Sequence, residues 1–370
     1  MNARRLNLLG EILSLPTAPF REEAVVEYIR NWAADTGIAF RRDRSGNVIL
    51  RGRRPWGPSK GPRWVFAAHM DHPGFVSVAQ RGRIVEAQFR GHVLPEYFVG
   101  SVARFLTPAG GVRARVRSIR RPKDSPFATC RLELALAADV PPGTIGMWDK
   151  PAFALRGRRA ISRACDDLGG VAAVLCAMKE VAARNIPADV TGLLTRAEEV
   201  GFVGALAACR DRVLPKGSLV VAIETSAAQP NARLGDGVVV RVGDRLRTFD
   251  PSLTAHVQSA AEELAKRDGR FRFARQLMPG GTCESTVYCA MGYQATGLCV
   301  PLGNYHNMSP AGIITAETID LDDFDCLVKL LVALAVSGKG PADADARLKA
   351  RLAKLLRQEG RLLKETGGDS

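Results

Sequence analysis

Short apolar runs alternate along the chain with stretches in which apolar residues have helical spacing. A helical pattern covers about residues 21–36 and ends near Gly37, as helices commonly do. Apolar runs of strand length lie at 48–50, 64–68, 191–194, 218–223 and 295–300. Helical patterns separate several of them, at 169–184, 201–213, 252–267 and 284–291. Buried strands that alternate with helices predict a three-layer α/β domain with a mostly parallel sheet.

Residues 76–154 have a different pattern. They are rich in β-branched residues, Gly, Pro and Arg, and they contain short alternating runs such as R-A-R-V-R-S-I and C-R-L-E-L-A-L, with no helix of length. Alternation of apolar and polar residues is typical of half-buried strands. We therefore predict an inserted, all-β, barrel-like domain at 76–154, which interrupts an α/β domain made of residues 1–75 and 155–340.

The end of the chain, residues 341–370, is a third region. Leucines at 348, 352, 355 and 356 follow a helical period, and basic residues lie between them. This pattern predicts a basic helical C-terminal tail. One interpretation is a solvated helix that docks a single apolar face. The other is a helix that contacts further subunits or binds a polyanion.

Composition places the chain among ordinary globular proteins, since 46% of its 370 residues are apolar and 24% are charged. No run approaches roughly 18 uninterrupted apolar residues, so we expect no membrane span and no membrane partner. The net charge of +14 would permit contact with nucleic acid, but Lys and Arg are spread along the chain without interleaved aromatic residues. Nucleic acid is therefore not an expected partner.

The eight cysteines show no C-x-x-C pair and no regular spacing. Several of them lie in apolar contexts, such as Cys176 and Cys326. This pattern is typical of reduced, mostly buried thiols. The apolar stretch near the N-terminus is interrupted by polar residues, which indicates a first helix rather than a signal peptide. Both features predict a cytoplasmic protein.

A carboxylate or an imidazole follows the end of each of four predicted strands. These residues are His69 and Asp71 after the run at 64–68, Glu198 and Glu199 after 191–194, Glu224 after 218–223, and His306 after 295–300. Asp166 and Asp167 lie just before the helix predicted at 169–184. Because the carboxyl ends of parallel strands meet at one edge of an α/β sheet, we expect these groups to lie close together.

Such a cluster of acidic groups predicts bound cations. Without cations, mutual repulsion raises the pKa values of the carboxyl groups and makes the cluster costly. Imidazole nitrogens and carboxylates suit Zn²⁺ or a similar metal, with one carboxylate bridging two ions and an open position for water. Two such ions can share a hydroxide and polarise a carbonyl. One further carboxylate, not a ligand, would take the proton from water and pass it to the leaving amine.

Each motif also has a purely structural interpretation. An H-x-D motif can be an ordinary ion pair, D-D-L-G-G can be a helix N-cap, and E-E-V-G can be a solvated helix start. The occurrence of all of them in this order, each near a strand end, favours a shared site. His72 is interpreted as a polar rim residue, His92 and His256 as structural, and Cys165 and Cys283 as apolar space-fillers.

Six segments of the chain carry a family likeness. They are L-P-T-A-P-F-R-E-E at 15–23, H-M-D at 69–71, A-C-D-D-L-G-G at 164–170, E-E-V-G-F-V-G-A at 198–205, G-G-T at 280–282 and N-Y-H-N-M-S-P at 304–310. They resemble the glutamyl aminopeptidase and tetrahedral aminopeptidase family of co-catalytic dinuclear zinc exopeptidases. The likeness runs to about residue 338. It implies that the α/β domain is a catalytic domain of zinc-exopeptidase type.

The spacing of the motifs separates this family from its relatives. Asp166 follows His69 by 97 residues (166 − 69), and His306 follows Glu224 by 82 (306 − 224). Related metallocarboxypeptidases and deacylases carry their extra domain in the second interval, whereas the aminopeptidases carry it in the first. The resemblance implies that this insert serves oligomer assembly, so we expect a homo-oligomer.

The resemblance also implies a ligand set. The implied ligands are His69 and Glu224 for one metal ion, Glu199 and His306 for the other, and Asp166 as the bridge. We therefore expect two divalent ions per subunit, Zn²⁺ with Co²⁺ or Mn²⁺ as alternatives.

Two further carboxylates complete the implied site. Glu198 would be the general base, and Asp71 would orient the ligand His69. The sequence thus predicts an aminopeptidase that removes N-terminal residues from peptide substrates by attack of a metal-bridged hydroxide. The alternatives are a metal-dependent deacylase or carboxypeptidase acting on N-acyl amino acids, and a non-catalytic metal-stabilised binding protein.

Three positions depart from the family pattern. Glu224 stands where Asp is usual, Cys283 stands where an Asp follows G-G-T, and His72 stands where an acidic residue is usual. We expect these changes to surround the substrate pocket.

Overall fold

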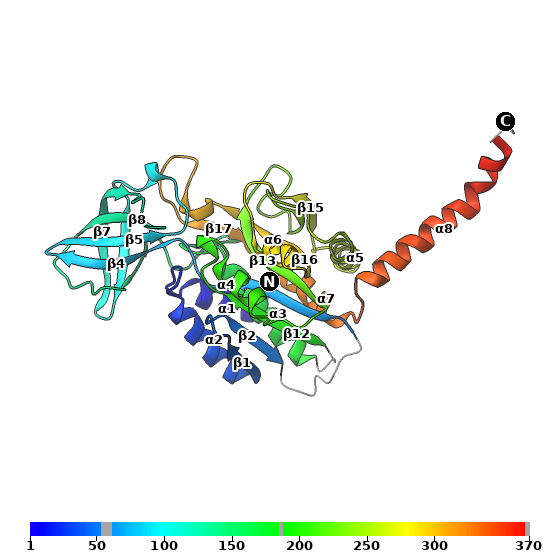
Figure 1. Ribbon diagram of the computed structural model, residues 1–370, viewed down its shortest axis with the longest axis horizontal. Helices are drawn as coiled ribbons and strands as arrows, with labels where there is room; N and C mark the ends of the chain where they lie inside the picture. Colours follow the sequence, from blue (N-terminus) through cyan, green and yellow to red (C-terminus); the bar gives the residue numbers. More distant parts are fainter. Residues whose placement is uncertain (53–60, 185–187, 367–370) are drawn as a thin grey trace.

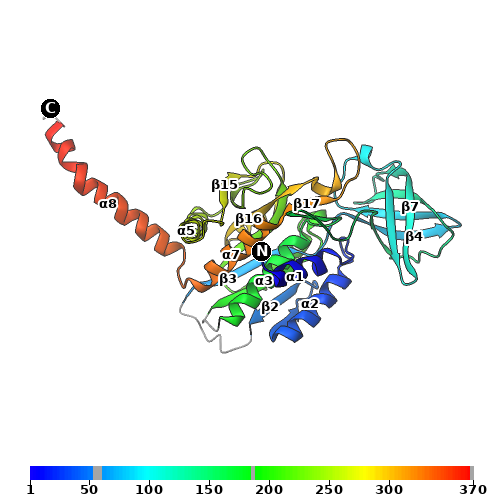
Figure 2. The same ribbon diagram turned by 180° about the vertical axis from the view of Figure 1, so that it is seen from behind.

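The computed structural model describes residues 1–52, 61–184 and 188–366. A layered α/β body occupies the middle of the molecule, a small β-barrel lies at one end, and the last helix projects from the other end (Figures 1 and 2). The last four residues of the predicted tail, 367–370, lie outside the described residues.

The body is built on one large mixed sheet. Its strands lie in the order β1 (Ile38–Arg42), β2 (Val48–Gly52), β12 (Asp189–Thr195), β3 (Arg63–His69), β13 (Ser218–Ala227), β16 (Gln294–Gly303), β17 (Glu317–Asp320), β11 (Arg159–Ser162) and β10 (Ala154–Arg156). Two more strands extend it, because β14 (Val238–Gly243) pairs with β16, and β15 (Phe273–Leu277) pairs with β14. The neighbours β12, β3, β13 and β16 run parallel and form the centre.

The central strands are apolar along nearly their whole length because helices cover both faces of the sheet. In β3, Trp64 and Phe66 belong to one apolar cluster, while Val65 and Ala67 belong to another. Successive side chains of a strand point to opposite faces, so the two clusters lie on opposite sides of the sheet. This explains why the run at 64–68 reads as continuously hydrophobic.

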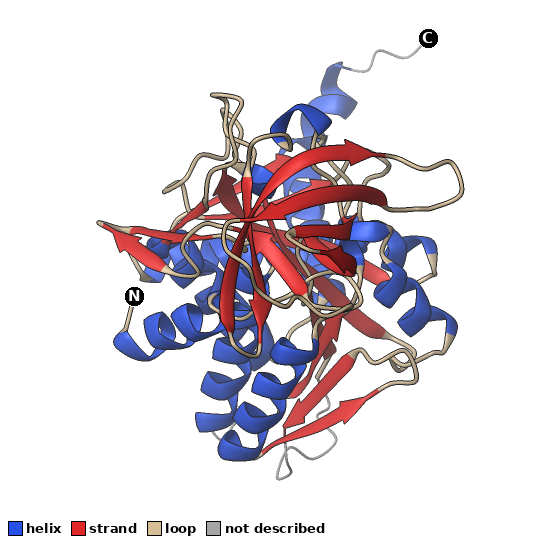
Figure 3. Ribbon diagram, turned by 90° about the vertical axis from the view of Figure 1, so that its left-hand side faces the viewer, coloured by secondary structure: helices blue, strands red, loops and turns tan. Residues whose placement is uncertain are grey.

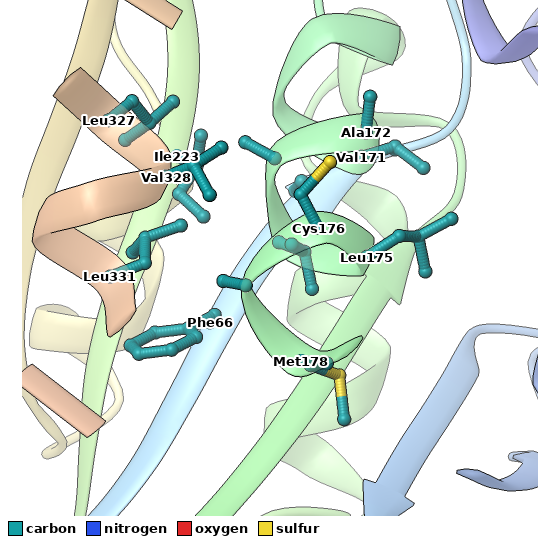
Figure 4. Packing of buried hydrophobic residues seen from close by; sticks show 14 of the residues in the cluster. Phe66, Val171, Ala172, Leu175, Cys176, Met178, Ile223, Leu327, Val328 and Leu331 are labelled. Carbon is teal, nitrogen blue, oxygen red and sulfur yellow. The ribbon is translucent and has the colours of Figure 1, made fainter. Parts of the chain in front are cut away.

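Different helices complete each apolar layer. The cluster of Phe66 includes residues of α1 (Ala3–Leu13), α2 (Glu23–Thr36), α3 (Leu168–Ala183), α5 (Pro251–Arg267) and α7 (Leu321–Val336). The cluster of Val65 includes residues of α4 (Val203–Arg210) and α6 (Glu284–Ala290). Figure 4 shows Leu327 and Leu331 of α7 beside Ile223 and Phe66 of the sheet. The predicted three-layer α/β architecture is confirmed.

Six strands of the insert close into a barrel. Their order around the barrel is β4 (Gly74–Arg81), β5 (Ile84–Arg90), β8 (Ala128–Leu134), β7 (Gly110–Arg120), β6 (Val102–Thr107) and β9 (Ile145–Trp148). Figure 3 views the molecule from this end. The barrel confirms the predicted all-β insert. We propose that the chain divides close to the predicted bounds, 76–154 for the inserted domain and 1–75 with 155–340 for the body, although β4 already begins at Gly74, two residues before the predicted insert.

Aromatic rings fill the barrel core. The ring centroids of Phe75 and Trp148 lie 4.9 Å apart, and those of Phe89 and Phe98 lie 4.7 Å apart, all in edge-to-face contact. Edge-to-face pairs add to the stabilisation from area burial alone because the positive ring edge meets the negative ring face. This cluster gives the barrel a core separate from that of the body.

The last helix, α8 (Pro341–Thr366), contacts the body through its first turns. Ser252 of α5 donates a hydrogen bond to Asp345 (2.9 Å), and Arg347 forms an ion pair with Glu263 (3.3 Å). The leucines at 348, 352, 355 and 356 are 48–65% exposed, so this apolar stripe is not docked on the described part of the chain. Within that part, no helix is both long enough and apolar enough to span a membrane.

The barrel core yields a stability prediction. Phe98→Ala should lower the free energy of unfolding by about 3–5 kcal/mol, because it removes buried surface and leaves a cavity among rings. Urea unfolding followed by tryptophan fluorescence measures the change. Glu96, two residues earlier, is exposed, so Glu96→Ala is the matched control with an effect within about 0.5 kcal/mol. Equal effects of the two substitutions would contradict the prediction.

Candidate metal centre

The residues predicted to cluster do meet at the carboxyl edge of the central strands. His69 ends β3, Glu224 lies near the end of β13, and Asp166 lies just before α3. Glu198 and Glu199 form a one-turn helix, η2 (Glu198–Val200), that follows β12, and His306 lies in η3 (Tyr305–Asn307) after β16. All of them are buried except Glu199, which is partly exposed although its side chain is only 5% exposed.

Two groups of three ligand-type side chains share Asp166. In the first group, His69 Nε2 lies 3.5 Å from Asp166 Oδ1 and 3.7 Å from Glu224 Oε2. In the second group, His306 Nε2 lies 3.6 Å from Asp166 Oδ2 and 3.1 Å from Glu199 Oε2. The ligand-type atoms of each group lie within 4.8 Å of one another. The two oxygens of Asp166 thus face different histidines, which is the arrangement that a bridging carboxylate needs.

The chemistry of these side chains fits divalent cations. Asp166 Oδ1, Glu199 Oε1, Glu224 Oε1 and His306 Nε2 are buried and have no hydrogen-bond partner among the described residues. Buried polar atoms almost always have a partner, and an unpaired one is costly. A cation bound by each group would provide a partner for these unpaired atoms.

Both histidines direct the same nitrogen toward the cluster. The other ring nitrogen of His69, Nδ1, lies 3.1 Å from the carbonyl oxygen of Asp71. In His306, Nδ1 lies 2.6 Å from the carbonyl oxygen of His92. Since a carbonyl only accepts, each Nδ1 donates a proton to it, which leaves Nε2 as the nitrogen that a metal would bind in place of a proton.

Burial and charge repulsion act together on the ionisable groups. Burial raises the pKa of Glu198 well above its ordinary value, and the neighbouring carboxylates raise it further. Burial lowers the pKa of His69 and His306, but the surrounding carboxylates outweigh burial and raise both values well above the ordinary one. Protons and cations therefore compete for this cluster, as at other metal sites.

The Asp71 carboxylate contacts the backbone of the two adjacent glutamates. Its Oδ1 accepts a hydrogen bond from the backbone N–H of Glu198 (3.0 Å), and its Oδ2 accepts one from Glu199 (3.1 Å). Its carboxylate lies 3.7 Å from His69 Nδ1, farther than its own carbonyl oxygen does. The Asp71 side chain therefore fixes the Glu198–Glu199 backbone, and its backbone carbonyl orients His69.

Glu22 and Glu317 are buried carboxylates near the site that the sequence analysis did not find. Glu22 accepts hydrogen bonds from the backbone N–H of Ala197 (3.1 Å) and from Arg196 Nε (2.7 Å). Glu317 accepts hydrogen bonds from the backbone N–H groups of three other residues. Glu22 lies in the segment 15–23 that resembles the family, so the resemblance could have identified it. Glu317 belongs to no recognisable motif, so no signal in the sequence pointed to it.

His72 is buried rather than at the rim. Its Nδ1 lies 2.5 Å from the carbonyl oxygen of Asp166, and its Nε2 lies 3.1 Å from Asn307 Oδ1. Burial, helped by the nearby His306, lowers the pKa of His72 to about 4, so its ring stays neutral.

Asp167 caps α3, as one interpretation of its motif predicted, by accepting a hydrogen bond from the backbone N–H of Gly170 (3.2 Å). The peptide bond between Asp166 and Asp167 is cis.

A cavity of about 410 Å³ opens over the cluster. Its wall includes Glu198, Phe202, Arg241, Met278 and Tyr305. A cavity of this size can hold one amino-acid residue and part of the next.

The two cysteines near the site lack a reactive thiolate. Burial raises the pKa of Cys283 to about 12, and it raises the pKa of Cys165 well above the ordinary value. Burial thus disfavours the thiolate form of both residues, and neither cysteine belongs to a ligand group among the described residues. Cys283, which departs from the family pattern, does line the cavity, as expected.

Similar proteins share this architecture. A putative aminopeptidase of Acetivibrio thermocellus is 24% identical over 322 residues, which cover 84% of this chain and 91% of that protein. An aminopeptidase of the archaeon Desulfurococcus kamchatkensis has a solved structure with a TM-score of 0.74 and 21% identity, covering 93% of this chain and 97% of its own. The Pyrococcus horikoshii TET1 peptidase, which can assemble into a tetrahedron or a large octahedral shell, has a TM-score of 0.72 and 22% identity, covering 90% and 99%.

A match to a family covers more than half of the chain. Residues 127–330, which include four of the five implied metal ligands and the two adjacent glutamates, match the M42 glutamyl aminopeptidase family. The predicted class of enzyme, an exopeptidase-type hydrolase, is confirmed by this match together with the similar aminopeptidases. The chain therefore belongs to the M42 glutamyl aminopeptidase family.

Proposed function

We propose that this protein is a dinuclear metal-dependent aminopeptidase that removes residues from the N-termini of peptides. The observation that carries the proposal is the pair of three-residue groups joined by Asp166. Each group offers one imidazole nitrogen and carboxylate oxygens, a donor set suited to Zn²⁺ or a similar ion.

The proposed ligands follow the two groups. His69 and Glu224 would hold one ion, Glu199 and His306 would hold the other, and Asp166 would hold both. We propose Zn²⁺, with Co²⁺ and Mn²⁺ as alternatives. When bound, such ions polarise a peptide carbonyl, lower the pKa of water and stabilise negative charge in the transition state.

Glu198 is the proposed general base. Its carboxylate lines the cavity and lies in a group with His69 and Glu199, but it belongs to neither of the two groups joined by Asp166. A carboxylate beside the proposed ligands is placed to accept a proton from water, and burial raises its pKa. Glu198 takes the proton of the attacking water and delivers it to the leaving amine, while Asp71 holds the Glu198 backbone in place.

A cationic side chain in the cavity wall supports a preference for an acidic N-terminal residue. Arg241 is only 3% exposed, its Nη1 donates a hydrogen bond to Ser226 (3.2 Å), and its Nε has no partner among the described residues. No described carboxylate lies within ion-pair distance of it; burial lowers the pKa of its guanidinium, but nearby acidic groups that include Glu224 and Asp244 outweigh burial and raise it. A substrate side-chain carboxylate would give this buried guanidinium a direct ion-pair partner in the cavity.

The exposed apolar residues of the barrel support a homo-oligomer. Val78 is 50% exposed, Val99 64% and Leu136 76%, and all three belong to the barrel or its loops. Contact between subunits would cover them. Similar proteins are described as a dodecamer and as a tetrahedron.

We also propose a cytoplasmic location, supported by eight free cysteines, because disulfides are rare in a reducing compartment.

The reaction class is tested with a panel of aminoacyl-anilides. Zinc-loaded protein should hydrolyse substrates with a free amine and should not hydrolyse the same substrates after N-acetylation. Release of the aniline is read by absorbance. Hydrolysis of only the acetylated compounds would favour the alternative deacylase. A metal-loaded protein that leaves every free-amine substrate intact would contradict the proposed aminopeptidase.

The two adjacent glutamates should behave differently. Glu198→Gln should retain both metal ions and lower kcat by about 10²–10⁴-fold, since the amide cannot accept the proton. Glu199→Gln should lose about one ion per subunit, because it removes a charged ligand. Metal analysis and anilide turnover of each variant measure the two effects. If both variants retain full activity, the assigned roles are wrong.

The preference for acidic residues depends on Arg241. Arg241→Met should lower kcat/KM for glutamyl-anilide by about 30-fold or more, because loss of one member of a buried charge pair costs about 2–5 kcal/mol. The value for leucyl-anilide should change little. Arg245 lines the same cavity but is exposed, so Arg245→Met is the matched control with a smaller effect. An equal loss on both substrates would contradict the assignment.

A further inference from the structure

Glu317 joins two ligand-bearing segments that are far apart in the sequence. Its side chain is completely buried at the start of β17. Its Oε2 accepts hydrogen bonds from the backbone N–H groups of Cys165 (2.7 Å) and Asp166 (3.0 Å), and its Oε1 accepts one from His306 (2.8 Å). Asp166 and His306 are 140 residues apart in the chain (306 − 166), so one carboxylate fixes the distance between them.

The segment around His306 needs such support. Asn304, His306 and Asn307 have left-handed backbone conformations, with φ of 57°, 52° and 64°. Residues other than Gly adopt this region at a cost, and they remain there only when surrounding contacts hold them. The hydrogen bond from the His306 N–H to Glu317 is one of these contacts.

We propose that Glu317 is a positioning residue of the metal centre, which sets the bridging carboxylate of Asp166 and the imidazole of His306 at the separation that a second metal ion requires. This inference rests on the proposed function. Glu317 does not line the cavity, so it acts through the two backbone segments and touches neither substrate nor the reacting atoms.

A carboxylate is needed at this position because both of its oxygens accept hydrogen bonds. One oxygen accepts from Cys165 and Asp166, and the other accepts from His306. Glutamine has the same shape but offers one acceptor oxygen and one NH₂ donor. In one orientation its NH₂ would face the N–H of His306, and in the other it would face the N–H groups of Cys165 and Asp166. In either orientation the NH₂ group of glutamine faces a backbone N–H. Two donors cannot form a hydrogen bond with each other, so the segment that carries Asp166 or His306 would move.

Buried carboxylates also accept backbone N–H groups near the adjacent glutamates, Glu198 and Glu199. Asp71 accepts from the backbone N–H groups of Glu198 and Glu199, and Glu22 accepts from Ala197, which also has a left-handed φ of 52°. Buried carboxylates that accept backbone N–H groups thus support the segments that carry Asp166, Glu199 and His306. Of these carboxylates, Glu317 alone accepts hydrogen bonds from the backbone N–H groups of two separate ligand-bearing segments.

The test measures metal retention rather than activity. The full-length wild-type protein and E317Q are loaded with Zn²⁺, the bound zinc is counted, and the release of each ion to a chromogenic chelator is timed. Wild-type protein should release two ions slowly. E317Q should release one ion about 10–100-fold faster, as for loss of other residues that orient metal ligands. The faster ion should be the one that Glu199→Gln also loses.

Asp323 provides a matched control. It is also completely buried, and its two oxygens accept hydrogen bonds from the backbone N–H groups of Gly235 and Gly237, each at 2.7 Å. It lies outside the cavity wall and outside the ligand groups. D323N should therefore lower thermal stability as E317Q does, while its zinc release stays at the wild-type rate.

The outcomes separate this inference from the proposed function. Wild-type zinc release by folded E317Q, or equal acceleration in E317Q and D323N, would overturn the positioning role and leave the dinuclear site intact. A wild-type protein that binds no zinc would overturn both. If E317Q does not fold, E317D is measured in the same way. It keeps two acceptor oxygens on a shorter side chain, so intermediate release supports the role and wild-type release overturns it.

Discussion

The structure depends on holding several carboxylates together in a buried space. Asp166, Glu198, Glu199 and Glu224 meet at one edge of the sheet with their side chains almost inaccessible to solvent. Burial raises the pKa of Glu198 and Glu199, because an ionised carboxylate loses its hydration there. The cluster is therefore unfavourable for stability by itself. Its donor set fits cations that would compensate the charge, so a requirement of function is met at a cost in folding.

The sheet brings the cluster together, and backbone N–H groups keep it in register. In the parallel pair of β3 and β12, His69 lies opposite Thr195, so the η2 turn with its two glutamates begins beside the end of β3. Regular strand pairing ends at this point, and the loops beyond it have left-handed residues. Buried carboxylates accept hydrogen bonds from these loops, as Asp71 does from Glu198 and Glu199. A carboxylate suits this task because each of its oxygens can accept more than one N–H.

The barrel takes part in the site as well as in the proposed assembly. The carbonyl oxygen of His92, in the loop after β5, accepts the Nδ1 proton of His306 and so fixes which nitrogen faces the cluster. Tyr97 donates a hydrogen bond to the carbonyl oxygen of Ser309 (2.9 Å), close to the same histidine. The insert thus contacts the segment that carries His306.

The sequence by itself determined the architecture and the set of candidate ligands. Buried parallel strands are continuously apolar, so local pattern was sufficient to find the carboxylates and histidines that follow or end them. The choice of His69, Glu199, Glu224 and His306 as ligands among these residues came from the family resemblance. Only the tertiary structure decided what holds them. Glu317 reaches backbone N–H groups from segments distant in the chain, and a backbone donor has no residue type that a sequence can reveal. In the same way, no local pattern showed that His72 is buried or that the leucines of α8 are exposed, because burial depends on which distant segments lie nearby.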